Sequence, residues 1–299
     1  MELTKRQFDV LVAIEANKKE KYSQRDIAND TDISVGLVNK IISELYESGL
    51  IDSNSIITEK GLNVLEPYKV KRAIFLAAGF GSRMVPLTFN TPKPLIRVHG
   101  VRMIETLLDA VVEAGIEEIY IVRGYLGEQF EVLLHKYPNI KFIDNNMYNE
   151  ANNISSAYLI KDLLENAYVL ESDLILSNKK LIRKYEYNSN FLGIDVDRTD
   201  DWCFETKNGV ITKQKVGGVN CFQMIGISHY TKKDGKQLSK DIEEVFTSPG
   251  GKEKYWDQVP LSERKQNYKI CVRECRKEDI IEIDTFNELK QIDKTYDVK

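Results

Sequence analysis

Two short stretches of this 299-residue chain combine glycines with basic side chains in a pattern suited to phosphate chemistry. The first is Gly79-Phe80-Gly81-Ser82-Arg83, and the second, ten residues after Arg83, places Lys93 between two prolines. Glycines let backbone N–H groups approach phosphate oxygens closely, and Arg and Lys add positive charge. The pattern predicts a loop that binds the phosphates of a nucleotide, with Arg83 and Lys93 as its cations.

A carboxylate further along the chain follows a short apolar run. Residues 168–170 lead directly into Glu171-Ser172-Asp173, and a carboxylate at the end of a buried strand can hold Mg²⁺ beside a triphosphate. We therefore predict Asp173 as a metal ligand; the alternative is a surface acid that caps the next helix. Two other phosphate fingerprints are excluded, because Met84 replaces the third Gly of the dinucleotide motif and no G-x-x-x-x-G-K-[ST] occurs.

The segments around these residues alternate between strands and helices. Residues 73–78 form a continuous apolar run, typical of a strand buried on both faces of a parallel sheet. Such alternation predicts an α/β fold with a mainly parallel sheet that binds ligands at the carboxyl ends of its strands. The further predictions are strands at 118–122, 140–143 and 168–170, helices at 103–115, 126–136 and 154–164, and a basic loop around Lys207, Lys213 and Lys215.

The two halves of the phosphate motif together resemble the signature of a known superfamily. Ala77-Ala78-Gly79-x-Gly81-Ser82-Arg83, followed by Pro92-Lys93-Pro94-Leu95, is similar to the block of nucleotidyltransferases that activate sugar and alcohol phosphates with nucleoside triphosphates. Asn152-Asn153-x-x-Ser156 resembles the nucleotide loop of bacterial CTP:phosphocholine cytidylyltransferases, and the likeness extends over residues 72–293. It implies that residues 71–299 form a Rossmann-like nucleotidyltransferase domain with a mixed, mainly parallel sheet.

The resemblance also implies roles for single residues. Lys93, Arg83 and Asp173 would be catalytic, and Mg²⁺ would be held by Asp173 together with Asp257, whose alternative is a solvated loop acid. One position departs from the family pattern, because Glu171 stands where Asp is usual and its longer side chain could shift the geometry around the metal. The implied nucleotide-binding residues are Leu76, Ala77, Ala78, Gly79, Gly81, Ser82, Arg83, Lys93, Asn152, Asn153 and Ser156.

Three aromatic residues match family positions and would surround the ammonium group of the acceptor: Trp202, Tyr255 and Trp256. A trimethylammonium group cannot donate conventional hydrogen bonds, so aromatic faces and nearby negative charge recognise it. Both tryptophans of the chain lie next to an aspartate, which supplies that charge. The alternative for each of the three residues is packing in the core or at the rim.

The reaction implied is transfer of CMP from CTP to phosphocholine, giving CDP-choline and pyrophosphate. The acceptor phosphate is already ionised near neutral pH, so positioning and charge neutralisation suffice and no general base is needed. Alternative acceptors are phosphoethanolamine, 2-aminoethylphosphonate and a sugar 1-phosphate, the last of which calls for hydroxyl-binding residues at the positions of Trp202 and Trp256. An alternative of another class is a transcription regulator that senses CTP or phosphocholine.

The first 70 residues predict a separate small domain. Helical spacing over residues 4–14, a capping box at Ser23-Gln24-Arg25-Asp26 and an apolar helix face ending at Gly49 are followed by a short hairpin over residues 50–57. This order resembles the winged helix-turn-helix domain of bacterial transcription regulators. The resemblance implies that Ser34, Gly36, Asn39 and Lys40 face the major groove of DNA.

Charge weakens the DNA interpretation without removing it. Residues 1–72 hold eleven Lys and Arg against twelve Asp and Glu, with one basic cluster at Lys18, Lys19, Lys21 and Arg25. DNA binding ordinarily draws on a basic face that releases counterions. The alternative is a winged helix used for protein contact, including contact within a homodimer. We therefore expect a site-specific reader of DNA, if any, rather than a protein that coats it.

Composition sets the remaining limits. The chain has a formal net charge of −4 and no apolar run near the roughly 18 residues of a membrane span. The first residues lack a signal peptide's apolar core, so we expect a cytoplasmic protein without a membrane partner. The four cysteines form no zinc-type set, and the three histidines lie beside no plausible nucleophile. Catalysis is therefore expected from carboxylates, lysine, arginine and backbone groups.

Overall fold

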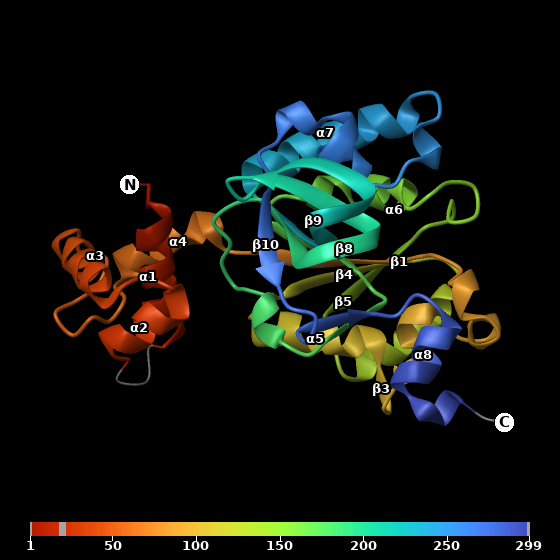
Figure 1. The fold of residues 1–299 in the computed structure, drawn as a ribbon, viewed down its shortest axis with the longest axis horizontal. Helices are drawn as coiled ribbons and strands as arrows, with labels where there is room; N and C mark the ends of the chain where they lie inside the picture. The colour runs from red at the N-terminus through yellow and green to blue at the C-terminus, as the bar shows by residue number, and fades with distance from the viewer. Residues whose placement is uncertain (1, 18–21, 298–299) are drawn as a thin grey trace. The chain divides into compact units, whose positions relative to one another are not determined.

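The computed structural model describes residues 2–17 and 22–297, and the chain divides into two units, Met1–Lys69 and Val70–Lys299 (Figure 1). The first unit contains α1 (Lys5–Ala16), α2 (Gln24–Thr31), α3 (Val35–Glu47) and α4 (Glu59–Leu65). Ser23 and Asp26 form the predicted capping box at the start of α2. Helix-turn-helix geometry is thus specified by local sequence.

The end of α3 and the wing follow the prediction with one adjustment. The C-cap of α3 is Ser48, and Gly49 comes next with a φ of 69°, the left-handed conformation that ends many helices. Ile51 pairs with Ile57 in an antiparallel bridge, which closes the short wing. Of the predicted basic cluster, Lys18, Lys19 and Lys21 lie outside the described residues, while Arg25 is exposed on α2.

A seven-stranded mixed sheet forms the centre of the second unit, with strand order β10-β8-β9-β6-β1-β4-β5. Strands β1, β4, β5 and β6 run parallel to their neighbours within this group, whereas β9 is antiparallel to both β6 and β8. The strand bounds are β1 (Arg72–Ala77), β4 (Glu118–Arg123), β5 (Ile140–Asp144), β6 (Ala167–Glu171), β8 (Asn190–Lys207), β9 (Val210–Tyr230) and β10 (Cys271–Cys275). The predicted mainly parallel α/β fold is confirmed.

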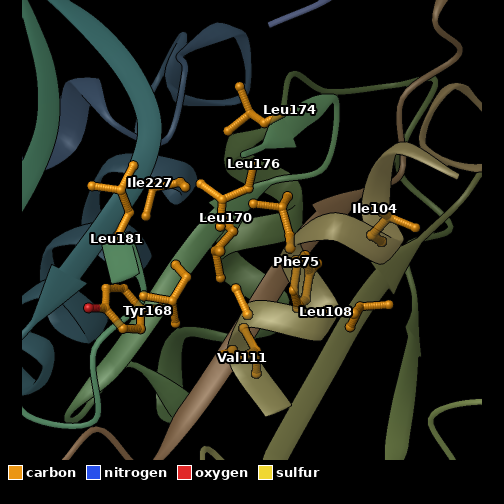
Figure 2. Packing of buried hydrophobic residues seen from close by; sticks show 14 of the residues in the cluster. Phe75, Ile104, Leu108, Val111, Tyr168, Leu170, Leu174, Leu176, Leu181 and Ile227 are labelled. Atoms are coloured by element: carbon orange, nitrogen blue, oxygen red, sulfur yellow. The ribbon is translucent and has the colours of Figure 1, made fainter. Parts of the chain in front are cut away.

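Helices cover both faces of this sheet, as Figure 1 shows. On one face, Phe75 of β1 packs in a cluster with Ile104 and Leu108 of α5 (Met103–Glu113), drawn in Figure 2. On the other face, its neighbour Ile74 belongs to a cluster with α6 (Ile154–Leu159) and α7 (Lys232–Thr247). Successive residues of a strand point to opposite faces, so an uninterrupted apolar run is needed at β1.

Three segments differ from the prediction. The expected helix over 126–136 is a 3₁₀ segment, Gly127–His135, and the helix expected over 154–164 ends at Leu159. The expected basic loop is instead part of a long hairpin formed by β8 and β9. Its turn is Asn208-Gly209, with φ of 52° and 73°, a sequence that favours a tight hairpin turn.

A second pair of strands joins distant parts of the chain. β7 (Leu174–Leu176) starts directly after Asp173 and pairs antiparallel with β11 (Ile280–Glu282), so that Leu174 lies opposite Glu282. Helix α8 (Phe286–Ile292) follows, and a small hairpin of β2 (Arg97–Val98) and β3 (Val101–Arg102) precedes α5. Within the described residues, no helix combines the length and apolar character that a membrane crossing requires.

Candidate active site

A cavity of about 740 Å³ opens at the carboxyl ends of β1 and β6. Its walls bring together segments that are as much as 200 residues apart in sequence, from the glycine loop to the residues after β11. The lining residues that concern the chemistry are Leu76, Ala77, Ala78, Gly79, Gly81, Ser82, Arg83, Lys93, Asn152, Asn153, Ser156, Glu171, Asp173, Asp201, Trp202, Gly226, Tyr255, Asp257, Glu282 and Asp284. Among the site residues predicted for this domain, Trp256 does not line the cavity.

The glycine loop requires glycine at position 81. Gly81 has a φ of 62°, and a Cβ there would lie 2.9 Å from the Cβ of Lys93 and 3.0 Å from Cγ2 of Thr88. The Thr88 hydroxyl donates a hydrogen bond of 3.0 Å to the Gly81 carbonyl, which fixes the turn. The two predicted halves of the phosphate motif therefore pack against each other directly.

Lys93 occupies the centre of the charged part of the cavity. Its ammonium group donates to Asp173 Oδ2 at 2.6 Å and to Asp284 Oδ1 at 3.1 Å, and only 10% of its side chain is exposed. Burial alone would lower the pKa of Lys93, but the two carboxylates outweigh it and raise that pKa. The lysine is therefore a fixed cation at the bottom of the site.

Arg83 reaches the same carboxylate from the solvent side. Its guanidinium group makes two hydrogen bonds to Asp284, of 2.9 Å and 2.8 Å, while 66% of its side chain remains exposed. A bidentate pair of this kind has the same planar geometry that guanidinium uses to bind phosphate. Asp284 thus pairs with both predicted catalytic cations.

Asp173, the other partner of Lys93, belongs to a cluster of three carboxylates. Glu171, Asp173 and Glu282 each offer an oxygen within 4.8 Å of the others, because the β7–β11 pairing places Glu282 next to the end of β6. Oδ1 of Asp173 is buried and has no hydrogen-bond partner. Clustered hard oxygen donors with an unsatisfied lone pair are chemically suited to a divalent cation such as Mg²⁺.

Crowding perturbs the acids of this cluster. Burial and the charges of Asp173 and Asp284 raise the pKa of Glu282 to about 8, although Lys93 opposes the shift. The pKa of Glu171 also rises well above its usual range, first through burial and then through Asp173 and Glu282. Like charges this close disfavour ionisation unless a cation compensates them. A cation bound to this cluster would therefore stabilise the ionised form of its carboxylates.

Glycine at position 226 makes room for the unusual Glu171. A Cβ built on Gly226, in β9, would lie only 2.3 Å from Oε2 of Glu171 and 2.6 Å from its Cδ. A larger residue would displace the carboxylate from the cluster. The departure from the family pattern noted in the sequence is thus accommodated by a second position on a neighbouring strand.

Asp257 lines the same cavity as Asp173. The three acids that lie close enough together to share a cation are Glu171, Asp173 and Glu282. Its carboxylate is almost fully buried and accepts a hydrogen bond from the amide of Gln214. Burial raises the pKa of Asp257 although this hydrogen bond opposes the shift. A metal shared by Asp173 and Asp257 stays a prediction, and the three-acid cluster offers a second set of ligands.

The asparagine loop supports the cavity wall. Asn153 accepts a hydrogen bond of 2.9 Å from the backbone N–H of Trp256, and Asn152 donates one of 3.2 Å to the Glu253 carbonyl. Ser156 lies at the start of α6, buried, with its hydroxyl 3.0 Å from the amide of Asn145. All three line the cavity, and their contact with a nucleoside stays a prediction.

The aromatic residues separate into two groups. Trp202 and Tyr255 form an edge-to-face pair with centroids 6.1 Å apart on the cavity wall, and Tyr255 is 44% exposed. Trp256 is only 2% exposed and packs between Phe191 and Tyr230. The prediction that Trp256 contacts the acceptor does not agree with this position, because its side chain points into the core rather than into the cavity.

Sequence reasoning assigned no role to Glu282, Asp284 and Gln214. Glu282 and Asp284 alternate with two isoleucines at the end of a strand, a pattern that signals side chains on one polar face. The pairing of that strand with β7, more than 100 residues earlier, carries no local signal. Gln214 could not be found because its segment was taken for a loop.

The four predicted DNA contacts share one exposed helix start. Ser34 is the N-cap of α3, and Gly36, Asn39 and Lys40 are exposed on its first turns. The Asn39 side chain accepts a hydrogen bond of 3.2 Å from Gln24, and Lys40 lies 4.0 Å from Glu44. These contacts are weak and exposed, so the polar side chains are free to exchange partners.

The architecture and the paired charges of this cavity define a nucleotidyl transferase. Residues 72–223 match the nucleotidyl transferase family, to which the chain belongs. Residues 3–52 match the winged helix-turn-helix DNA-binding family. The identification made from the two phosphate-motif halves and the N-terminal helices is therefore confirmed.

Several relatives of the chain are cytidylyltransferases. The 2-aminoethylphosphonate cytidylyltransferase of Lancefieldella rimae is 36% identical over 228 residues, which covers 75% of this chain and 92% of the relative. The choline-phosphate cytidylyltransferase of Haemophilus influenzae is 32% identical over 223 residues, 74% of this chain and 95% of the relative. The structure of CTP:phosphocholine cytidylyltransferase from Streptococcus pneumoniae (LicC) superposes with a TM-score of 0.69 at 29% identity, over 75% of this chain and 98% of that one.

Proposed function

We propose that this protein transfers the cytidylyl group of CTP to a small phosphonate or phosphate that carries an ammonium group, with 2-aminoethylphosphonate as its acceptor. The observation that carries this proposal is a single cavity in which two phosphate-binding cations lie beside two aromatic rings and additional acids. Cations suit the triphosphate and the anionic end of the acceptor. Acids and rings suit its cationic end.

The phosphate side would work by exchange of anions. Arg83 and Lys93 give up carboxylate oxygens for phosphate oxygens, and the glycine loop donates backbone N–H groups. The acceptor oxygen is already ionised near neutral pH, so the chain has to align it with the α-phosphorus and neutralise charge. Lys93, the most deeply placed cation, is the residue we assign to the α-phosphate.

Mg²⁺ is the proposed cofactor, and the acid cluster fits it. Glu171, Asp173 and Glu282 would hold the ion, and Asp284 becomes available when its basic partners turn to phosphate. When bound, the ion supplies charge neutralisation at the reacting phosphate. The buried, unpartnered Oδ1 of Asp173 is the feature that favours a ligand here. Asp257, the second ligand expected from sequence, lines the same cavity, and we assign it to the acceptor.

The acceptor side favours a primary ammonium group. Trp202 and Tyr255 provide two ring faces, while Asp201 and Asp257 line the same cavity as acceptors of hydrogen bonds. A primary ammonium donates three hydrogen bonds and benefits from carboxylates, whereas a trimethylammonium group depends mainly on aromatic surface. Burial of Trp256 removes one ring from the cage that the sequence implied.

Phosphocholine is the second candidate acceptor. The edge-to-face pair of Trp202 and Tyr255 presents ring surface that a quaternary ammonium group can use. The choline-phosphate cytidylyltransferase relative and the LicC structure cover the second unit almost completely. This candidate requires that two rings, with Asp257 behind them, replace a larger aromatic cage.

Pyrophosphate release measured over a grid of nucleotides and acceptors tests the proposal. CTP, UTP, ATP and GTP would each be combined with 2-aminoethylphosphonate, phosphoethanolamine, phosphocholine and glucose 1-phosphate. We expect turnover with CTP and the greatest kcat/KM with 2-aminoethylphosphonate. A preference for phosphocholine would select the second candidate, and turnover only with the sugar phosphate would contradict both.

For the first unit we propose site-specific DNA binding through Ser34, Gly36, Asn39 and Lys40. Their exposure at the start of α3 and the family match of residues 3–52 support it. Selection from random DNA at two salt concentrations should enrich one site that Asn39→Ala and Lys40→Ala weaken. Without an enriched site, protein contact would be the better account of this unit, and enrichment that depends on CTP would favour a ligand-sensing regulator.

A further inference from the structure

The amino group of Lys93 bridges two carboxylates at the edge of the acid cluster. It contacts Oδ2 of Asp173 at 2.6 Å and Oδ1 of Asp284 at 3.1 Å, so one cation joins two carboxylates that are far apart in sequence. Glu171 and Glu282 stand within 4.8 Å of the Asp173 carboxylate. Lys93 therefore supplies positive charge to Asp284 and to Asp173, the member of the acid cluster that it contacts.

We propose that Lys93 competes with a divalent ion for the carboxylate of Asp173, so that the ion binds tightly only after phosphates have drawn this side chain away. The proposal rests on the nucleotidyl transfer proposed above and adds an order of binding to it. Lys93 then has two successive partners: the carboxylates in the resting enzyme and a phosphate in the loaded one. Lys93 thus binds phosphate and also competes with the metal ion for its ligands.

Competition follows from the geometry of the two carboxylates. Lys93 holds one oxygen of Asp173, and the other belongs to the cluster with Glu171 and Glu282, so an ion in that cluster would lie close to the ammonium group. The two like charges repel each other, so each weakens the binding of the other. The lysine backbone lies in the 3₁₀ turn Lys93–Leu95, flanked by buried Pro94 and Leu95, so exchange must take place by rotation of the side chain.

The triphosphate provides the reason for that rotation. A single lysine ammonium has three donors, and two of them are now used by Asp173 and Asp284. Phosphate oxygens attract the ammonium as strongly as carboxylates do and arrive together with the backbone N–H groups of the glycine loop. Nucleotide entry thus exchanges one anion for another at Lys93 and opens two carboxylates at the same time.

Calorimetric titration of Mn²⁺ into the nucleotide-free, full-length protein tests the proposal. Lys93→Met removes the charge and keeps the length of the side chain, so we expect Mn²⁺ to bind on the order of tenfold or more tightly than to the wild type. Adding Asp173→Asn to Lys93→Met should abolish that gain. Lys136→Met is the matched control, because Lys136 pairs with Asp109 outside the cavity and its loss should leave Mn²⁺ affinity unchanged.

An unchanged or weaker Mn²⁺ affinity in folded Lys93→Met protein would overturn the proposal. Thermal unfolding checks the fold, and Lys93→Gln serves as the second variant if Lys93→Met melts early. The readout is independent of the acceptor. If Lys93→Met binds Mn²⁺ more tightly but the wild type does not turn over CTP, the role of Lys93 at the metal site stands and the proposed function is rejected. If the wild type turns over CTP but Lys93→Met binds Mn²⁺ no more tightly, the proposed function stands and this role of Lys93 is rejected.

Discussion

The two sides of the cavity differ in how their charges are balanced. On the proposed phosphate side, Arg83 and Lys93 have carboxylate partners. On the acceptor side, Asp201 and Asp257 face the cavity without a basic partner anywhere in residues 2–17 and 22–297. One side is therefore prepared to exchange ions, and the other is prepared to receive a cation.

The same two sides also differ in how their residues are held. The glycine loop and Lys93 lie within about 15 residues of each other and pack through Gly81 and Thr88. Trp202, Asp257 and Gln214 come from a long hairpin and a distant loop that meet through tertiary contacts. The phosphate side thus depends on local geometry, whereas the acceptor side depends on the pairing of β8 with β9.

Asp173→Asn should have the largest effect, because Asp173 both pairs with Lys93 and belongs to the acid cluster with Glu171 and Glu282. We expect kcat for pyrophosphate release to fall by about a thousandfold, the scale seen when one electrostatic contact to a transition state is lost. Asp195→Asn, an exposed position on β8 outside the cavity, is the matched control. If both variants kept wild-type turnover, the acid cluster would have no catalytic role.

Trp202→Ala should affect the acceptor side selectively. Loss of a ring beside an ammonium group costs on the order of 1–2 kcal/mol, so we expect the acceptor KM to rise by about tenfold. The KM for CTP should remain near its wild-type value, and Trp202→Phe should recover most of the loss. Equal changes in both KM values would show that the two sides are not separate.

Gly226→Ala should have a smaller effect on the phosphate side through Glu171. The new methyl group would overlap the Glu171 carboxylate, so we expect turnover and Mn²⁺ affinity to fall by several-fold. Glu171→Asp, combined with Gly226→Ala, shortens the side chain and should restore Mn²⁺ binding. Failure of this double variant to improve on Gly226→Ala alone would contradict the pairing of the two positions.

We expect the smallest effect from substitution of His229, which lies at the opposite end of the sheet from the cavity. Burial lowers the pKa of His229, so this residue stays neutral in the fold at pH values where the unfolded chain is already protonated. Stability is therefore complete above the unfolded pKa of about 6.5 and declines as pH falls below it. His229→Gln should reduce that decline by a few degrees in Tm between pH 7 and pH 5, while kcat at pH 7.5 stays unchanged.

The parts that could be predicted from sequence are those set by short-range rules. The apolar run of β1, the capping box at Ser23 and the two halves of the phosphate motif each act over a few residues. The hairpin of β8 and β9 was missed although Asn208-Gly209 marks its turn, because charged side chains on its exposed faces hid the alternation.

Long-range contacts explain the remaining misses at the site. Trp256 and Asp257 are neighbours in sequence, yet one side chain enters the core and the other enters the cavity. The partner of Asp173 comes from β11, whose position is fixed only by pairing with β7. Which acids share a cation depends on that pairing, and no local spacing rule encodes it.

The place where the chain enters β1 has a consequence for engineering. Backbone N–H groups of Val70 and Lys71 donate to the carbonyls of Lys184 and Asn166, so the second unit is already anchored at its first two residues. This anchor is at the amino end of β1, while the glycine loop follows its carboxyl end, about 20 Å along the strand. Residue 70 is therefore a natural fusion point, at which a different N-terminal module could be attached without rebuilding the glycine loop.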